Sequence, residues 1–281
     1  MSALAKSTAP GPTGEAELSQ AELDRVISIA GKLTGIVLNA QKHTMIKARL
    51  SRRLRVLGMP EFKSYLDFLE SPDGAGEIEA FINAVTTNLT SFFREGHHFA
   101  HLETQVLAPL AKSGRSRVRI WSSACSTGEE PYSIAMTALG SSHYAKSWDF
   151  KILATDLNTD TIAHGAAGIY SGDRCEAIPE RYQKFARAQG QQFQMAKELR
   201  DTIAFRRLNL LEPWPFKGPF DAIFCRNVMI YFDAPTKAWL LERFAELLEP
   251  GGVLYLGHSE SLLGEHPLLA RDGQTAYRRR P

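Results

Sequence analysis

Two adjacent acids, Glu129 and Glu130, follow a small-residue loop over residues 122–128, which itself follows a short apolar run over residues 118–121. Such an apolar run between turn-rich stretches is typical of a buried parallel strand, and Pro131 then opens an amphipathic helix. A strand, a tight loop and a helix form the nucleotide cradle of α/β folds, although taken alone the stretch also fits an ordinary strand-to-helix turn. Neither GxGxxG nor a phosphate loop is present. Because a carboxylate repels phosphate and attracts an ammonium or sulfonium group, the loop favours S-adenosylmethionine as its ligand.

The whole chain sets limits on the class of protein. Its 281 residues are enough for one large domain or two smaller ones, and 44% hydrophobic residues supply a sizeable core. A net charge of +2 is too balanced for a general nucleic-acid binder. The three cysteines are scattered, which argues against a disulfide framework and against a metal site and fits a reducing compartment. No apolar run approaches a membrane span, so we expect a cytoplasmic protein with a disordered tail over residues 1–18.

The segment after this tail has helical periodicity. Ser19 and Glu22 form a capping box for a helix over residues 20–31. Asn39 caps a second helix, which ends before Gly58. Further helices are expected over residues 60–70 and 77–87, so residues 19–90 are predicted to form a small all-helical domain.

The second of these helices carries a basic arc. Ile46, Leu50 and Leu54 share its apolar face. The basic residues on another arc are Lys42, Arg49, Arg52 and Arg53. A solvated helix face normally mixes charge signs, whereas this arc is nearly all positive, so both a solvated face and an acidic partner are open interpretations.

Residues 87–95, TNLTSFFRE, join the helical segment to a long helix expected over residues 96–111. Two phenylalanines in this stretch would anchor it to a core. Anchoring does not explain why Asn88, Thr90 and Arg94 gather there, since all three carry side chains that form hydrogen bonds.

The rest of the chain alternates strands and helices, which indicates a parallel sheet covered on both faces. Strands are expected over residues 151–155, 203–208, 220–225, 253–257 and 274–279, with a helix from Pro235 to Glu249 that Pro250-Gly251-Gly252 ends. Residues 169–202 lack the helical rhythm, and AQGQQ at 188–192 resembles a hairpin turn, so we expect a small inserted β-subdomain there. The predicted fold is therefore α/β, with a Rossmann-like domain over residues 91–281.

Polar groups stand at the carboxyl ends of these strands, where ligands of open α/β sheets bind. Asp156 follows the second strand, where an acid accepts hydrogen bonds from ribose hydroxyls, although it could also cap the helix over residues 159–168. Asn209 and Leu210 follow the next strand and would bind adenine. Either Glu129 or Glu130 would bind the ammonium group, and we favour Glu129.

Several longer stretches resemble those of a known family. TNLTSFFRE, STGEEPYSIA, FDAIFCRNVMIYFD, LEPGG and GHSES together look like the bacterial chemotaxis receptor methyltransferases, the CheR family, over residues 19–280. The resemblance implies a helical domain, a methyltransferase domain and an inserted β-subdomain. It also implies methyl transfer from S-adenosylmethionine to glutamate side chains on the cytoplasmic helices of chemoreceptors, with S-adenosylhomocysteine as the other product.

The resemblance also implies site residues. The cofactor positions that match are Asn88, Thr90, Arg94, Glu129, Asp156, Asn209, Leu210, Asn227 and Val228. Arg94 and Tyr231 match the active-site positions. A glutamate carboxylate is already ionised at neutral pH, so no general base is required and catalysis rests on positioning. Arg94 can grip a carboxylate with two hydrogen bonds, and Tyr231 can add a donor; the structural alternatives are an ion pair of Arg94 with Glu95 or Asp156 and a core position for Tyr231.

The implied partners are receptor helices, to which the basic arc is complementary, and the enzyme is expected to be a monomer recruited to membrane receptor arrays. Some members of the family dock their insert on a receptor C-terminal peptide. The insert loop here has a single glycine, Gly190, which argues against such docking. A nucleic-acid methyltransferase would carry an Asn/Asp-Pro-Pro-Tyr/Phe loop, which is absent. A cofactor sensor without catalysis is a third interpretation, and the presence of both Arg94 and Tyr231 argues against it.

Overall fold

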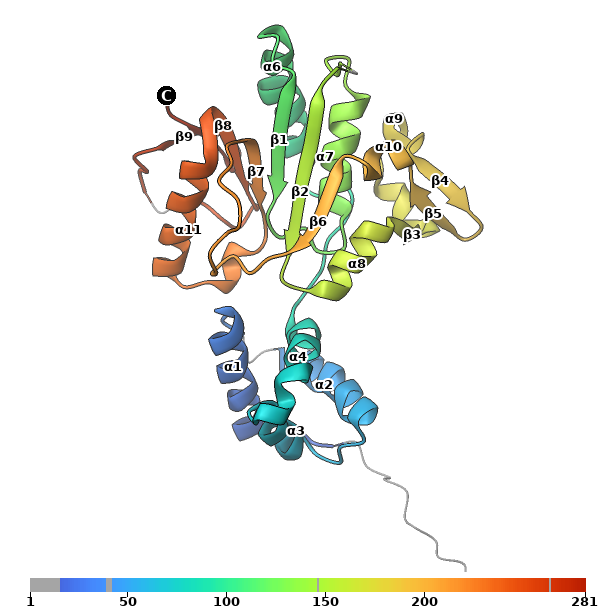
Figure 1. Ribbon diagram of the computed structural model, residues 1–281, viewed down its shortest axis with the longest axis vertical. Helices are drawn as coiled ribbons and strands as arrows, with labels where there is room; N and C mark the ends of the chain where they lie inside the picture. Colours follow the sequence, from blue (N-terminus) through green and yellow to red (C-terminus); the bar gives the residue numbers. More distant parts are fainter. Residues whose placement is uncertain (1–15, 39–41, 146, 263) are drawn as a thin grey trace, which may run out of the picture. The chain divides into compact units, whose positions relative to one another are not determined.

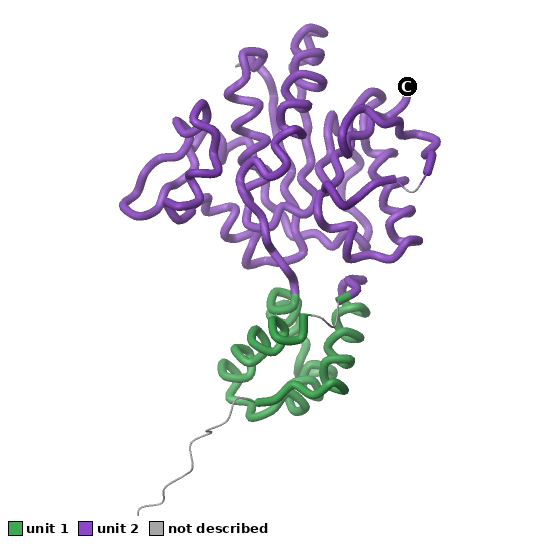
Figure 2. The backbone as a smooth tube through the Cα atoms, turned by 180° about the vertical axis from the view of Figure 1, so that it is seen from behind, with its two compact units in different colours: residues 1–33, 38–85 green, residues 34–37, 86–281 purple. Residues whose placement is uncertain are grey.

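A computed structural model describes residues 16–38, 42–145, 147–262 and 264–281 of the chain. Asn39, the predicted cap of the second helix, lies outside the described residues, as do residues 1–15 of the predicted tail. Two compact units are present, residues 1–33 with 38–85 and residues 34–37 with 86–281 (Figure 2). Within the described part of the chain, no helix is long and apolar enough to cross a membrane.

The first unit is helical. Its elements are α1 (Gln20–Thr34), α2 (His43–Leu57), α3 (Phe62–Leu69), the 3-10 helix η2 (Pro72–Glu77) and α4 (Ile78–Val85). The capping box of α1 is confirmed, because the Ser19 backbone N–H donates to Glu22 Oε2 at 2.8 Å and the Glu22 N–H donates to Ser19 Oγ at 3.3 Å. α2 ends at Gly58, as expected, in the left-handed conformation with φ 67°. Its N-cap position is Lys42, without a side-chain cap, so α2 begins later than the predicted Asn39 cap implied.

The second unit is built on a seven-stranded sheet with the order β6-β2-β1-β7-β8-β10-β9 (Figure 1). Its strands are β1 (Arg117–Ser122), β2 (Asp149–Asp156), β6 (Ile203–Arg207), β7 (Phe220–Cys225), β8 (Leu248–Leu256), β9 (Leu269–Gly273) and β10 (Ala276–Arg279). The strands from β6 to β8 pair in parallel, whereas β10 is antiparallel to both β8 and β9. The strand order therefore reverses between β1 and β7, which places the ligand crevice of the sheet at their carboxyl ends.

Both faces of this sheet are buried. Along β7, Ala222 and Phe224 face one apolar cluster, with Tyr132 and Ile134 of α7 (Glu129–Gly140). Ile223 and Cys225, which alternate with them, belong to a second cluster, with Phe244 of α11 (Ala234–Leu247). This two-sided burial is why β7 is apolar at every position except Asp221.

The predicted inserted subdomain is a three-stranded antiparallel sheet with the order β3-β5-β4. Its elements are β3 (Ile169–Ser171), η4 (Gly172–Ala177), α9 (Glu180–Gln183), β4 (Ala186–Gln189), β5 (Gln192–Met195) and α10 (Lys197–Arg200). Gly190, in the turn between β4 and β5, has φ 62°, as the predicted hairpin turn requires.

Two helices of the second unit begin or end at other residues than expected. α7 begins at Glu129 rather than Pro131, because Gly128 supplies its N-terminal turn with φ 97° and Pro131 sits in the first turn, where a missing N–H costs nothing. α11 begins at Ala234 and is capped by Asp233, whose carboxylate accepts the Thr236 N–H at 2.9 Å. It ends at Leu247, since residues 248–250 already belong to β8, so the prediction that Pro250-Gly251-Gly252 ends this helix is wrong.

The helix expected over residues 96–111 is divided into α5 (His97–His101), a π-helical segment η3 (Leu102–Leu107) and α6 (Ala108–Lys112). Pro109 explains this irregularity, because it has no N–H for the carbonyl of Gln105, four residues earlier. Arg278 of β10 donates to that carbonyl instead, at 3.2 Å. β9 was not predicted, and the predicted last strand included Gln274 and Thr275, which form the β9–β10 turn.

Candidate active site

The loop between β1 and α7 is held tightly against the neighbouring strand ends. The Cys125 N–H donates to the Thr155 carbonyl at 2.8 Å, and the Gly128 N–H donates to the Cys125 carbonyl at 3.0 Å. A Cβ at Gly128 would lie 2.8 Å from the Gly165 Cα, so only glycine fits this close approach. The small residues of this loop thus let the backbone line the crevice directly.

Asp156 lies at the end of β2, half-buried, and is joined to this loop. Its Oδ2 accepts the Ser126 N–H at 2.8 Å, and its Oδ1 accepts the Asn158 N–H at 2.9 Å. The cap of α8 (Thr159–Ala167) is Asn158, which accepts from the Thr161 N–H, so Asp156 is not the helix cap. Burial raises the pKa of Asp156, and the backbone N–H donors partly offset this effect. Each carboxylate oxygen keeps a lone pair that can accept a further hydrogen bond, as binding of a ribose diol requires.

Ser126 also connects Asp156 to the segment before α5. Its hydroxyl donates to the Asn88 carbonyl at 3.0 Å. The backbone at Asn88, the Asp156 carboxylate and the cradle loop therefore meet at one point of the second unit.

The two adjacent acids of α7 have different surroundings. Glu130 is buried; its Oε1 accepts the Ser122 hydroxyl at 2.7 Å and its Oε2 pairs with Arg226 Nη1 at 2.9 Å. Burial raises the pKa of Glu130, against the opposing effect of the Arg226 charge. Glu129 is fully buried, accepts the Thr127 hydroxyl at 2.6 Å and forms an ion pair with Arg174 of the inserted subdomain. Glu130 is thus bound within the core of the site, whereas Glu129 faces the insert.

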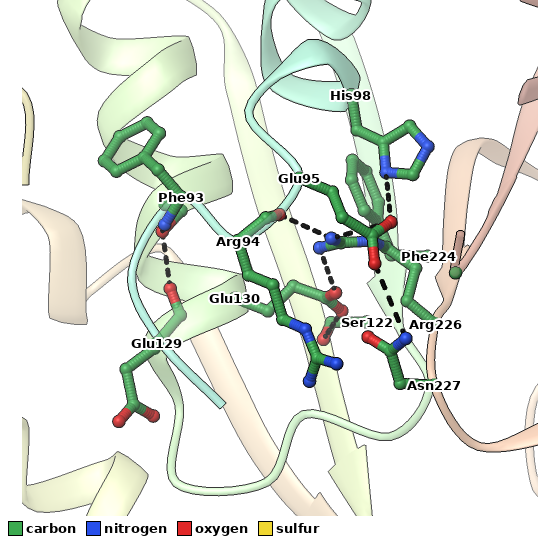
Figure 3. A network of polar contacts seen from close by, with 12 residues as sticks. Phe93, Arg94, Glu95, His98, Ser122, Glu129, Glu130, Phe224, Arg226 and Asn227 are labelled. Atoms are coloured by element: carbon green, nitrogen blue, oxygen red, sulfur yellow. Dashed lines mark hydrogen bonds and ion pairs between the residues drawn. The ribbon is translucent and has the colours of Figure 1, made fainter. Parts of the chain in front are cut away.

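Arg226 is the centre of a buried ionic network, and its side chain is 2% exposed (Figure 3). Besides Glu130 it pairs with Glu95 Oε2 at 3.2 Å and donates to the Arg94 carbonyl. Burial opposes ionisation of Glu95, but Arg226 and a hydrogen bond from His258 outweigh it and lower the pKa of Glu95 to about 2. Arg226 therefore joins the end of β7 to α7 and to the segment that carries Arg94.

Glu260 organises the loop that follows β7. It accepts the backbone N–H groups of Asn227 at 2.9 Å, Gly257 at 2.7 Å and Ile230 at 3.3 Å. Asn227 has φ 59°, a left-handed conformation that these bonds help to hold. Glu260 also lines a cavity of about 130 Å³ together with residues of α11, β8 and the 3-10 helix η5 (Met229–Tyr231).

Arg94 and Tyr231 are both half-buried and lie within electrostatic range of each other. The Arg94 guanidinium donates to the Leu89 carbonyl at 3.0 Å, and Figure 3 shows it pointing away from the Glu95 carboxylate. Among the residues that the structure describes, no carboxylate forms an ion pair with Arg94, so the structural ion pair considered for it is not present. Burial raises the pKa of Tyr231, so its hydroxyl is protonated at neutral pH and can donate.

The remaining predicted cofactor residues lie on neighbouring loops. Asn209 follows β6 and forms a turn in which its Oδ1 accepts the Leu211 N–H at 3.0 Å. The Leu208 N–H donates to the Asp156 carbonyl at 2.9 Å, so this loop adjoins Asp156. Leu210 is buried in the second apolar cluster, against which Val228 also packs. Thr90 is half-buried two residues beyond Asn88.

A second group of side chains has the composition of a metal site. The ligand atoms of Glu95, His97 and His98 lie within 4.8 Å of one another. Burial lowers the pKa of His98 to about 3, so it is neutral, but Arg226 already supplies a positive charge beside Glu95. That charge would repel a metal cation, and we therefore assign the group to the ionic network.

The basic arc lies in the first unit and is more constrained than the sequence suggested. Arg53 donates two hydrogen bonds of 2.7 Å to Glu77, which is 7% exposed, and Arg49 donates to the Ala84 carbonyl at 3.2 Å. Desolvation and repulsion from Arg49 lower the pKa of Lys42. Arg52 is exposed. Glu77 therefore neutralises the charge of Arg53 within the domain. The helical periodicity of the sequence alone could not show this pairing.

Sequence reasoning missed Ser126, Arg174, Arg226 and Glu260 as parts of the site. Two of them had a usable signal: Arg226 stands at the end of a buried strand, and Glu260 follows another such end in GHSES. A charged residue at either place must find partners among its neighbours, although the sequence does not say which.

Comparison with known proteins gives this geometry a family. The family described as "CheR methyltransferase, SAM binding domain" matches residues 88–277, and "CheR methyltransferase, all-alpha domain" matches residues 21–86. A probable chemotaxis protein methyltransferase of Rhizobium etli is 45% identical over 252 residues, covering 87% of this chain and 94% of that protein. The chemotaxis protein methyltransferase of Escherichia coli is 43% identical over 266 residues, covering 92% and 91%.

A solved SAM-dependent methyltransferase from Methanosarcina mazei has a TM-score of 0.32 at 15% identity, over 50% of this chain and 52% of that one, a likeness too low to bear on function. The two domain matches and the relatives together cover most of the chain. The protein therefore belongs to the CheR family of chemotaxis protein methyltransferases, and its methyl donor is S-adenosylmethionine.

Proposed function

We propose that this enzyme methylates glutamate side chains on the cytoplasmic helices of chemoreceptors and so serves adaptation in chemotaxis. The observation that carries the proposal is the Arg94 guanidinium, which has no carboxylate partner among the described residues and lies near a protonated Tyr231. A site that holds a cation and a neutral donor beside a methyl-donor crevice is suited to an anionic methyl acceptor.

The residues divide the work of binding and positioning. Asp156 would accept the ribose hydroxyls. Glu129 would bind the ammonium group, because the cation paired with Glu130 is Arg226, only 2% exposed, whereas the cation paired with Glu129 is Arg174, which is 45% exposed and can be displaced. The other contacts to the donor would come from Asn88, Thr90, Arg94, Asn209, Leu210, Asn227 and Val228.

When bound, S-adenosylmethionine supplies a sulfonium methyl group to which a carboxylate oxygen bonds as the carbon–sulfur bond breaks, giving an ester and S-adenosylhomocysteine. Arg94 would hold the acceptor carboxylate in line with this methyl group. The Tyr231 hydroxyl would donate a further hydrogen bond to the same carboxylate and so fix its orientation. An ionised carboxylate has no proton to lose, so none of the chain's residues needs to act as a base.

Besides the crevice, the substrate would meet a basic surface. Exposed Arg52 of the first unit, with its basic neighbours on α2, is complementary to acidic receptor helices. This partnership would place a monomeric enzyme in the cytoplasm, recruited to membrane receptor arrays. Docking of a receptor C-terminal peptide on the insert is not part of the proposal, because the loop at Gly190 lacks the further glycines expected of it.

The direct test uses labelled S-adenosylmethionine with membranes that contain the organism's receptors, followed by alkaline release of methanol. A carboxyl methyl ester gives base-labile label, and label that resists base would overturn the proposal. Arg94→Lys provides the matched variant, because lysine keeps the charge and loses the two-pronged grip. We expect turnover to fall strongly while the melting temperature stays near that of the wild type; the opposite pattern would assign Arg94 a structural role.

A further inference from the structure

Arg174, the ion-pair partner of Glu129, has no role in the function described so far. Glu129 opens α7 beside the cradle loop, and its side chain is fully buried. Arg174 comes from η4 of the inserted subdomain, and its side chain is 45% exposed. The guanidinium covers one carboxylate oxygen, Oε1, while the Thr127 hydroxyl donates to the other at 2.6 Å.

This arrangement restricts how Glu129 can meet a ligand. An ammonium group can reach the carboxylate only if Arg174 moves from Oε1. Leaving a buried carboxylate without a cation is costly, so the guanidinium can leave only as another positive charge arrives. The arriving ammonium of an amino acid carries a carboxylate on the same carbon, and that carboxylate needs a cation of its own.

We propose that Glu129 and Arg174 together form a subsite for the amino-acid zwitterion of the methyl donor, in which Arg174 binds the α-carboxylate. One internal ion pair is then exchanged for two pairs with the ligand, and the total charge of the site does not change. Arginine suits this role because its planar fork donates two parallel hydrogen bonds to a carboxylate. The inference rests on the proposed assignment of Glu129 to the ammonium group.

The subsite would also give the insert a part in cofactor recognition. Tyr170 of β3 donates to the Thr127 carbonyl at 2.8 Å, so the insert contacts the cradle loop at a second point close to Glu129. Arg174 is therefore held near the ligand by a segment that is itself anchored to the cradle.

Calorimetry without any receptor tests the proposal. The ligands are S-adenosylhomocysteine, its decarboxylated amine analogue and methylthioadenosine, which lacks both charged groups. We expect Arg174→Met to weaken binding of S-adenosylhomocysteine about 10- to 100-fold and to leave binding of methylthioadenosine within about twofold of wild type. The amine analogue should bind at least as tightly as to the wild type, because its ammonium group no longer has to displace Arg174 from Glu129. Arg174→Lys should lose less of the affinity for S-adenosylhomocysteine. Arg187→Met is the matched control, because Arg187 is an exposed arginine of the insert that pairs with exposed Glu198 at 3.6 Å.

Two results would overturn the proposal. Unchanged or tighter binding of S-adenosylhomocysteine by Arg174→Met would show that Arg174 only covers Glu129 and competes with the ligand. An equal loss for all three ligands, with a lowered melting temperature, would show a structural role. Glu129→Gln tests the assignment of Glu129 to the ammonium group separately from the role of Arg174. If this variant binds the amine analogue as tightly as the wild type does, Glu129 does not bind the ammonium group.

Discussion

Replacing Arg226 by methionine should destabilise the protein in a way that depends on pH with a particular sign. The substitution keeps much of the volume and leaves Glu95 and Glu130 buried without their shared cation. Removing one member of a buried ion pair costs about 3–5 kcal/mol. At about 1.4 kcal/mol per pKa unit, this cost equals an upward shift of about two to four units, divided between the two carboxyl groups.

The sign of this pH dependence follows from the linkage between proton binding and folding stability. In the wild type, the pKa of Glu95 is lowered from 4.5 to about 2, so its stabilising contribution is present above 4.5 and is lost as pH falls toward 2. In the variant, Glu130 has no cation beside it, so its folded-state pKa, which burial already raises in the wild type, would lie further above its unfolded value. The folded state then binds more protons than the unfolded state, and stability falls as pH rises from about 5 to about 8.

Urea unfolding at several pH values measures this effect, and Glu130→Gln provides the control. Comparing Arg226→Met with Arg226→Met/Glu130→Gln cancels His98, which has a lowered pKa in its own right and is common to both proteins. We expect the double variant to be the more stable at about pH 8 and the difference to disappear near pH 5. A deficit that does not vary with pH, or no recovery in the double variant, would refute the assignment of Arg226 as the charge that keeps Glu130 in the core.

Three further predictions concern binding and turnover. Asp156→Asn should weaken the binding of S-adenosylhomocysteine by about 1.5–3 kcal/mol in calorimetry, because it replaces a charged hydrogen-bond acceptor by a neutral one. A wild-type affinity would show that Asp156 does not bind the ribose. Tyr231→Phe should bind the cofactor normally and turn over more slowly at saturating substrates, because only the hydroxyl is lost; an unchanged turnover would make Tyr231 a packing residue. Arg52→Glu should raise the receptor Michaelis constant and make it less sensitive to salt, whereas the exposed Lys63→Glu on α3 should not. Equal effects of the two reversals would show that only net charge matters.

The strands and the cradle were predictable because their signals are local. A run such as Phe220–Cys225 is buried at every position and apolar at every position except Asp221, because it is covered on both faces, and this pattern can be recognised without knowledge of the partners. The order of strand ends then brings Asp156 and the loop of Asn209 to one edge. Gly190 likewise marks its hairpin by the positive φ that the turn requires.

The ionic partners were not predictable in the same way. Glu95 and Arg226 are far apart in the sequence, and nothing in either neighbourhood states that they pair. Arg53 appeared to be one of several equivalent basic residues, yet buried Glu77, from a different helix, neutralises it; reversing Arg53 would place two carboxylates together and break the domain. The end of α11 was misplaced because Pro-Gly-Gly ends a helix or interrupts a strand equally well, and here the Phe220–Ala222 register shift of β7 against β8 accommodates it.

The hydrogen bonds of Glu260 reduce the conformational entropy that the site loses when a ligand binds. One buried carboxylate accepts N–H groups from the segments after β7 and after β8, so these segments hold their conformation before any ligand arrives. Conformational freedom that is already lost does not have to be lost on binding, which raises affinity without adding a contact. The amides of Asn227, Ile230 and Gly257 should consequently exchange slowly with solvent deuterium even in the free protein.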